Sequence, residues 1–261
     1  MKKYLIAGAA ALMVLALLHL PKTGEELGLA SIDSLAYDTC FHITLEIEGR
    51  EFPITLAMRG EMTREPEVLH GRIRAGLRNA AGTMELYTET SGDSLFLYTG
   101  VRIGERIFWH KYREEKPELS LLDGAELMKL LGTTRQTGEG WTIDGTPGLA
   151  HQGEVTAGSL QKMLKAVMLL KGLEGEKAEE LQRLLNRLDP ETGIPFESIL
   201  DPETLQLLEL RVDLTDVVGE LLAGAKTGNS LKIPEFTFRL TLQDHNAVGP
   251  IQIPREARTA S

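Results

Sequence analysis

The chain has 261 residues, of which 28 are basic and 38 are acidic, so its formal net charge is −10. An acidic surface repels phosphate backbones, and this composition therefore argues against general nucleic-acid binding. Cys40 is the only cysteine, which excludes an intrachain disulfide and predicts a buried free thiol, with an intermolecular disulfide as the alternative.

The start of the chain has the pattern of an export signal. Lys2 and Lys3 precede an apolar run, Tyr4–Leu20, and a basic start before a short apolar run is typical of a signal peptide. The run reaches the lower length limit for crossing a bilayer, so cleavage and retention as an anchor both stay open. We predict a signal peptide or N-terminal membrane anchor at 1–30 and a single domain at 31–261. The protein is then extracytoplasmic, either secreted or anchored to the cell membrane.

The next part of the chain predicts a run of β-strands. Apolar and polar residues alternate with a period of two, which indicates strands with one buried face. The alternation predicts strands at 41–48, 52–58, 69–78, 83–89, 95–99 and 105–112. Because the connections are short, these strands are expected to form an antiparallel meander rather than βαβ units.

Helices are predicted in the middle of the chain. Apolar residues recur at helical spacing in Leu121–Leu131, Ser159–Leu170 and Glu176–Leu188. Two short β segments, Trp141–Ile143 and Leu149–Val155, surround a glycine- and proline-rich turn between the first two helices.

Strands resume after the helices. A hairpin is predicted from Pro195–Leu200 and Leu205–Leu214, followed by a short helix, Asp216–Ala225, and a last strand, Phe236–Leu242. Strands that enclose a helical middle predict an α+β fold. We expect a curved antiparallel sheet, an incomplete barrel, wrapped around amphipathic helices.

Three short segments resemble the LolA/LppX-like lipoprotein superfamily. They are the aromatic strand Phe108–Tyr112, the hairpin Ile199–Leu205 and the closing Ile251–Ala257, which is like the IPxEA ending of many Gram-positive members. The resemblance implies an incomplete antiparallel barrel around helices, in which known members hold acyl chains or lipoproteins. The chain departs from the family in having no lipobox cysteine after its apolar run, so lipid modification is not implied.

Signals for catalysis, metals and cofactors are weak. The glycine-rich stretch Gly219–Thr227 lacks the lysine directly after the second glycine that a Walker A loop requires. The histidines are scattered without metal-ligand spacing, and no GxSxG elbow occurs. We therefore predict no enzymatic activity, no cofactor and no metal.

Basic residues follow the polar side of the third predicted strand: His70, Arg72, Arg74 and Arg78. Such a stripe could dock an anionic wall polymer or lipid headgroup. The other interpretation is a solvated face whose charges pair across strands. Acidic residues on neighbouring strands favour the second interpretation: Glu46, Glu48, Glu85 and Glu89.

The inward apolar residues form the candidate ligand site. Periodicity does not distinguish a filled core from a gap that holds an acyl chain, although pliable methionines suit a gap. The predicted lining is Phe41, Ile43, Leu45, Ile54, Leu56, Met58, Leu95, Leu97, Trp109, Met163 and Met168. We predict a non-catalytic binding protein of the cell envelope that holds a lipid or other apolar ligand between sheet and helices. The alternative is a cell-surface structural or sensory interaction module with a fully packed core.

Overall fold

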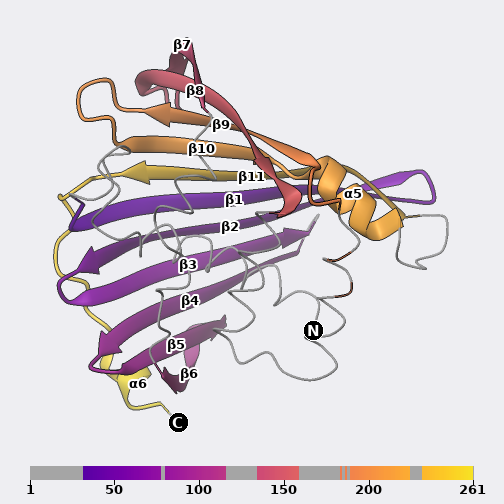
Figure 1. The fold of residues 1–261 in the computed structure, drawn as a ribbon. Coiled ribbons are helices and arrows are strands. Elements are labelled where there is room, and N and C mark those ends of the chain that lie inside the picture. Colours follow the sequence, from indigo (N-terminus) through magenta and orange to yellow (C-terminus); the bar gives the residue numbers. More distant parts are fainter. Residues whose placement is uncertain are drawn as a thin grey trace.

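One antiparallel sheet contains all the strands of the structure (Figure 1). The structure is a computed structural model that describes residues 32–77, 80–115, 134–158, 183, 186, 189–223 and 231–260. Its eleven strands are arranged in the order β6-β5-β4-β3-β2-β1-β11-β10-β9-β8-β7. Two meanders therefore run outward from the centre, where the first strand pairs with the last.

Long strands make up most of this sheet. The first meander consists of β1 (Ser34–Ile47), β2 (Arg50–Arg64), β3 (Glu67–Leu77), β4 (Ala80–Ser91), β5 (Ser94–Ile103) and β6 (Arg106–Glu115). The second consists of β7 (Arg135–Trp141), β8 (Pro147–Thr156), β9 (Gly193–Leu200), β10 (Leu207–Asp213) and β11 (Leu231–Gln243). Two short helices, α5 (Thr215–Ala223) and α6 (Arg255–Arg258), complete the described elements.

Most of the predicted strands are confirmed. The six strands predicted between residues 41 and 112 correspond to β1–β6, the predicted hairpin to β9 and β10, and the last strand to β11. The helix predicted at Asp216–Ala225 corresponds to α5. Trp141–Ile143 is wrong as a strand, because β7 ends at Trp141 and the residues after it form a turn.

The α+β prediction is wrong. The described residues are nearly all strand, in one open sheet, and their only two helices are short, so they do not form a barrel wrapped around amphipathic helices. Residues in β7 have no alternating pattern, yet pairing with β8 makes them a strand. The predicted helices at Leu121–Leu131, Ser159–Leu170 and Glu176–Leu188 lie outside the described residues, apart from isolated positions. Neither described helix is long and apolar enough to cross a bilayer.

Alternation along the strands gives the sheet two different faces. We call the side that carries the main core cluster the apolar face, and the opposite side the polar face. The apolar face runs across the middle strands through Phe41, Ile43, Met58, Ile73, Leu86, Leu210, Phe238 and Leu240. Val217 of α5 joins the same cluster, so this helix covers part of the apolar face next to β11.

Two glycines make room for a buried tyrosine on the apolar face. The Tyr37 hydroxyl donates a hydrogen bond of 2.8 Å to the backbone oxygen of His70, two strands away. A Cβ at Gly60 would lie 2.6 Å from that hydroxyl, and a Cβ at Gly71 would lie 2.8 Å from it. The tyrosine ring thus crosses β2 because β2 and β3 present no side chain beneath it.

The C-terminal segment packs against the polar face of the sheet. It leaves β11 beside the start of β1, where the Asn246 amide donates to the Ser34 carbonyl over 2.7 Å. It then follows one end of the sheet and brings α6 to β5 and β6 (Figure 1). Ile253 and Ala257 are buried there in a second apolar cluster with Val68, Tyr87 and Tyr98.

Replacing Gly60 with alanine should destabilise the fold. We expect Gly60→Ala to lower the free energy of unfolding by about 2–3 kcal/mol, because its Cβ would overlap the Tyr37 hydroxyl and the His70 backbone oxygen. Gly76→Ala is the matched control on β3, since its Cβ would meet nothing closer than 3.9 Å. Urea unfolding of both variants measures the difference, and equal stabilities would contradict the packing described for Tyr37.

Candidate functional site

Eight of the predicted lining residues share the apolar face. In the register of the sheet, Phe41 lies opposite Leu56 on one side and Phe238 on the other. The same parity extends through β3 and β4 to Leu97, which lies opposite Thr88. The eight residues are Phe41, Ile43, Leu45, Ile54, Leu56, Met58, Leu95 and Leu97. They come from three strands and carry no charge.

Three predicted residues do not join this set. Trp109 lies opposite Gly100 and belongs to the polar face, where it packs with the second apolar cluster beside Tyr87. Its assignment to the inward set is wrong, because a residue opposite an outward position also points outward. Met163 and Met168 lie outside the described residues.

The second meander contributes residues that the predicted lining lacks. The Phe41 ring lies 4.8 Å from the ring of Phe238 and 6.1 Å from that of Phe236, measured between centroids. Phe196 of β9 is buried in the same cluster. The alternation of Phe236–Leu242 predicted a strand that contains Phe236 and Phe238. The sequence did not indicate that this strand, β11, pairs with β1.

Two buried hydroxyl groups on the apolar face have partners within the protein. The Thr39 hydroxyl is 3.4 Å from the Met58 backbone oxygen, and the Tyr37 hydroxyl is bound to the His70 carbonyl. Burial, followed by the charge of Glu61, raises the pKa of Tyr37 well above its usual range, so the phenol stays neutral. This arrangement leaves the middle of the face suited to hydrocarbon rather than to charged groups.

The polar face pairs many of its own charges. Arg72 lies 3.4 Å from Glu85, as the sequence predicted for the basic stripe, and Arg102 lies 3.7 Å from the same carboxylate. Asp38 pairs with Arg59 across β1 and β2 at 2.7 Å. Arg74 is exposed and has no ion-pair partner among the described residues, while Arg78 lies outside them.

His70 is the exception among the stripe residues, because it is partly buried. Its ring stacks on Tyr87 with centroids 4.4 Å apart, and its Nε2 atom is buried without a hydrogen-bond partner in the described chain. Burial lowers the pKa of His70 despite the opposing charges of Glu85 and Glu61. The ring is therefore held neutral.

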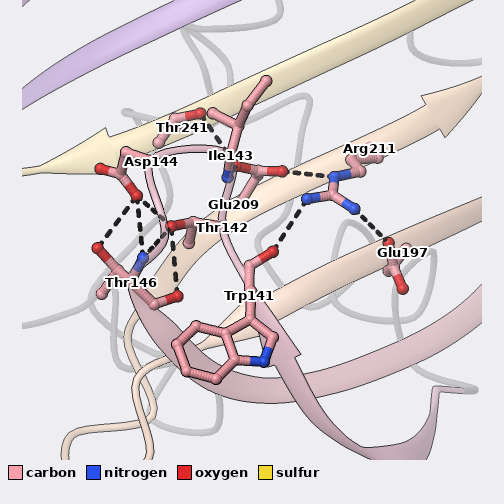
Figure 2. A network of polar contacts seen from close by, with 9 residues as sticks. All are labelled: Trp141, Thr142, Ile143, Asp144, Thr146, Glu197, Glu209, Arg211 and Thr241. Carbon is pink, nitrogen blue, oxygen red and sulfur yellow. Dashed lines mark hydrogen bonds and ion pairs between the residues drawn. The ribbon is translucent and has the colours of Figure 1, made fainter.

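A fully buried carboxylate, Glu209, lies on the polar face of β10 (Figure 2). One oxygen accepts the Ile143 backbone N–H over 2.8 Å and is 3.4 Å from the Thr241 hydroxyl, and the other pairs with Arg211. Because each oxygen is occupied within the protein, Glu209 is better explained as an anchor than as a catalytic acid.

The residues anchored by Glu209 are those that connect β7 to β8. Asp144 accepts hydrogen bonds from the Thr142 hydroxyl and from the Thr146 backbone and side chain, which lower its pKa. Arg211 donates to the Trp141 carbonyl over 3.1 Å and pairs with Glu197 at 3.0 Å (Figure 2). The turn is thus fixed on the sheet while the Trp141 side chain remains exposed.

Cys40 is a buried free thiol, as predicted. Its sulfur lies 3.2 Å from His42 Nε2. Burial raises the pKa of the Cys40 thiol, and the charge of Arg239 offsets only part of this effect. A protonated, buried thiol is a poor nucleophile. In the described ranges no three His, Cys, Asp or Glu side chains are grouped so that they could hold a metal ion.

Comparisons with known proteins add little. No family model and no curated protein matches the chain. Among solved structures, a DUF1329 family protein from Desulfovibrio piger ATCC 29098 is similar over 85% of this chain and 91% of its own, with 7% sequence identity and a TM-score of 0.22. A likeness at that TM-score supports no conclusion about fold or function.

Removing the charge of Glu209 should destabilise the protein. We expect Glu209→Gln to lower the free energy of unfolding by about 3 kcal/mol, because the amide cannot accept all of these bonds and leaves Arg211 without its buried partner. Glu197→Gln breaks a partly exposed pair with the same arginine and should cost less than about 1 kcal/mol. Chemical denaturation measures both, and a Glu209→Gln cost no larger than that of Glu197→Gln would argue against the anchoring role.

Stability should decrease in mild acid because of His70. Above pH 6.5 the ring is neutral in both states, whereas below it the unfolded chain binds a proton that the folded chain resists. The free energy of unfolding should therefore fall as the pH drops from 7 towards 5. His70→Phe, which keeps a ring to stack on Tyr87, should reduce this slope relative to the parent chain. Denaturation curves at the two pH values test it, and an unchanged slope would refute the assignment.

Proposed function

We propose that this protein is a non-catalytic extracytoplasmic binding protein that holds a lipid acyl chain or another apolar molecule on the apolar face of its sheet. The observation that supports this most is the continuity of that face. Uncharged residues of β5, β2 and β1 lie in one register with the phenylalanines of β11 and β9. The N-terminal pattern of Lys2, Lys3 and Tyr4–Leu20 supports the extracytoplasmic location.

The mechanism is reversible burial of hydrocarbon. Each methylene group transferred from water to the face contributes about 0.8 kcal/mol, so a chain of roughly ten methylenes supplies about 8 kcal/mol before the entropic costs of binding. No proton transfer and no covalent step is needed. The resemblance to LolA/LppX-like proteins is consistent with such a ligand, and it remains a prediction from sequence.

The alternative, an interaction module that acts through its polar face, has less support. Arg72 and Asp38 on this face already have partners of opposite charge within the chain, and Arg74 is the stripe residue that has none among the described residues. Recognition of a partner by Arg72 or Asp38 would exchange an internal pair for a pair with the partner, and half-exposed pairs of this kind add little net attraction.

A pair of adjacent residues on β5 tests the proposed site. Leu97 belongs to the apolar face and Phe96 to the polar face. We expect Leu97→Gln to weaken binding of a fluorescent fatty acid by about tenfold or more, because a polar amide would lie against the acyl chain. Phe96→Gln should leave binding unchanged. Fluorescence titration with circular dichroism as a check on folding measures both.

Two results would count against the proposal. One is equal binding by the two variants, which would place the probe elsewhere. The other comes from extracting the purified protein with organic solvent: if mass spectrometry finds no co-purified lipid and the parent chain binds no acyl probe, the protein is not an acyl-chain carrier.

A further inference from the structure

The β5–β6 hairpin exposes large apolar side chains, whereas those in the middle of the apolar face are buried. In the described part of the chain, eight large apolar residues are exposed, and four of them belong to this hairpin: Val101, Ile103, Phe108 and Tyr112. Ile103 is 66% exposed and Phe108 is 50% exposed, whereas Phe41 in the centre of the same face is 3% exposed. Exposed apolar groups that cluster in this way mark a contact surface.

These side chains lie together on one side of the hairpin. Val101 is directly opposite Phe108, and Ile103 is opposite Arg106 across the turn. Gly104, with φ of +62°, makes that tight turn possible. Since Val101 continues the parity of Leu97, the exposed group is an extension of the apolar face to the edge and end of the sheet.

Charges near the tip differ from those of the chain as a whole. The chain has a net charge of −10, but the tip and its neighbourhood carry Arg72, Arg102 and Arg106 against Glu85 and Glu105. Arg102 shares Glu85 with Arg72. No acidic side chain in the described ranges forms an ion pair with Arg106, which is exposed. The charged groups named here sum to +1, and Arg106, opposite Ile103, is the arginine that lies on the apolar side of the turn.

We infer that the tip of the β5–β6 hairpin inserts into the headgroup region of an anionic phospholipid bilayer. Apolar side chains bordered by arginine fit this environment, because the former enter the acyl boundary while the latter contact lipid phosphates. If the proposed function holds, the inserted hairpin also connects the bilayer with the apolar face, so the bilayer is the source of the ligand.

The opposite end of the sheet provides a matched control. Ile143 is 60% exposed there, beside Trp141. Its surroundings include the acidic side chains Glu139 and Asp144, which anionic headgroups would repel, and the neighbouring Arg211 is already paired with Glu197 and Glu209. Both ends thus present an isoleucine of similar exposure with opposite electrostatic surroundings.

A fluorescent reporter at each end tests the inference in the full chain. Ile103→Cys and Ile143→Cys are each labelled with NBD, and the parent chain, carried through the same reaction, measures any labelling of buried Cys40. Vesicles of phosphatidylcholine with phosphatidylglycerol are then added. We expect the reporter at 103 to shift to shorter wavelength, brighten severalfold and resist quenching by iodide, while the reporter at 143 stays unchanged. Arg106→Gln should raise the concentration of anionic vesicles needed for half the response by roughly fivefold.

Three outcomes would overturn the inference. The first is unchanged fluorescence of the reporter at 103 when vesicles are added, and the second is an equal fluorescence change at 103 and 143. The third is a response of the 103 reporter to monomeric dihexanoylphosphatidylcholine that equals its response to vesicles, which would identify free lipid rather than a bilayer as the partner. An unchanged response in Arg106→Gln would contradict the part played by headgroup charge.

The same proteins separate this inference from the proposed function. Insertion that persists while the parent chain binds no fatty-acid probe would support docking and reject the carrier function. Binding of the fatty-acid probe without insertion would support the carrier function and reject docking. Leu97→Gln, which alters the face but not the tip, should keep the vesicle response of the reporter at 103.

Discussion

The pairing of β1 with β11 is the interaction on which the rest of the sheet depends. It joins the two meanders at the centre, from Ala36 opposite Gln243 to Ile47 opposite Leu231. Without it, Phe41 of the first meander would lose its ring contacts with Phe236 and Phe238 of the second. Phe41 packs on Phe238 only because this register brings them together. The contact spans nearly the whole chain, so its large loop-closure cost must be met by burial across the entire face.

Once that register is set, every strand contributes to two surfaces with different physical roles. The polar face uses its groups on itself: Glu209 holds the β7–β8 turn, Arg72 and Arg102 share Glu85, and α6 covers Tyr98. The closing segment Ile251–Ala257 packs here, since Ile253 and Ala257 are buried against this face. The apolar face differs from it, because its middle residues carry no charge and form the main core cluster.

Local alternation predicted most strands, because period-two patterning is a property of each segment by itself. It could not predict that β1 and β11 are neighbours. It also could not predict β7, whose glycine- and polar-rich residues become a strand only through pairing with β8.

The placement of Trp109 is a different case. A two-residue turn at Gly104 and Glu105 sets Leu97 opposite Tyr112, and the same register sets Trp109 opposite Gly100. Counting from the turn would have assigned Trp109 to the polar face, whereas the predicted lining placed it inward. Of the eleven predicted lining residues, one thus lies on the polar face and two lie outside the described residues. The predicted lining also lacked the phenylalanines of β11.

The exposed residues of the β5–β6 hairpin are hard to explain by stability. Side chains that keep about half of their surface in water contribute little to the folded state, and charged residues at such an edge would protect it from association with other strands. Polar substitutes for Ile103 and Phe108 would therefore leave the fold nearly as stable and make it more soluble. The polar face of the same hairpin follows that rule, with Lys111 and Arg113 lying over the Phe96 ring. Because only the apolar side of the hairpin departs from it, the departure is best explained by a surface that this side meets outside the protein.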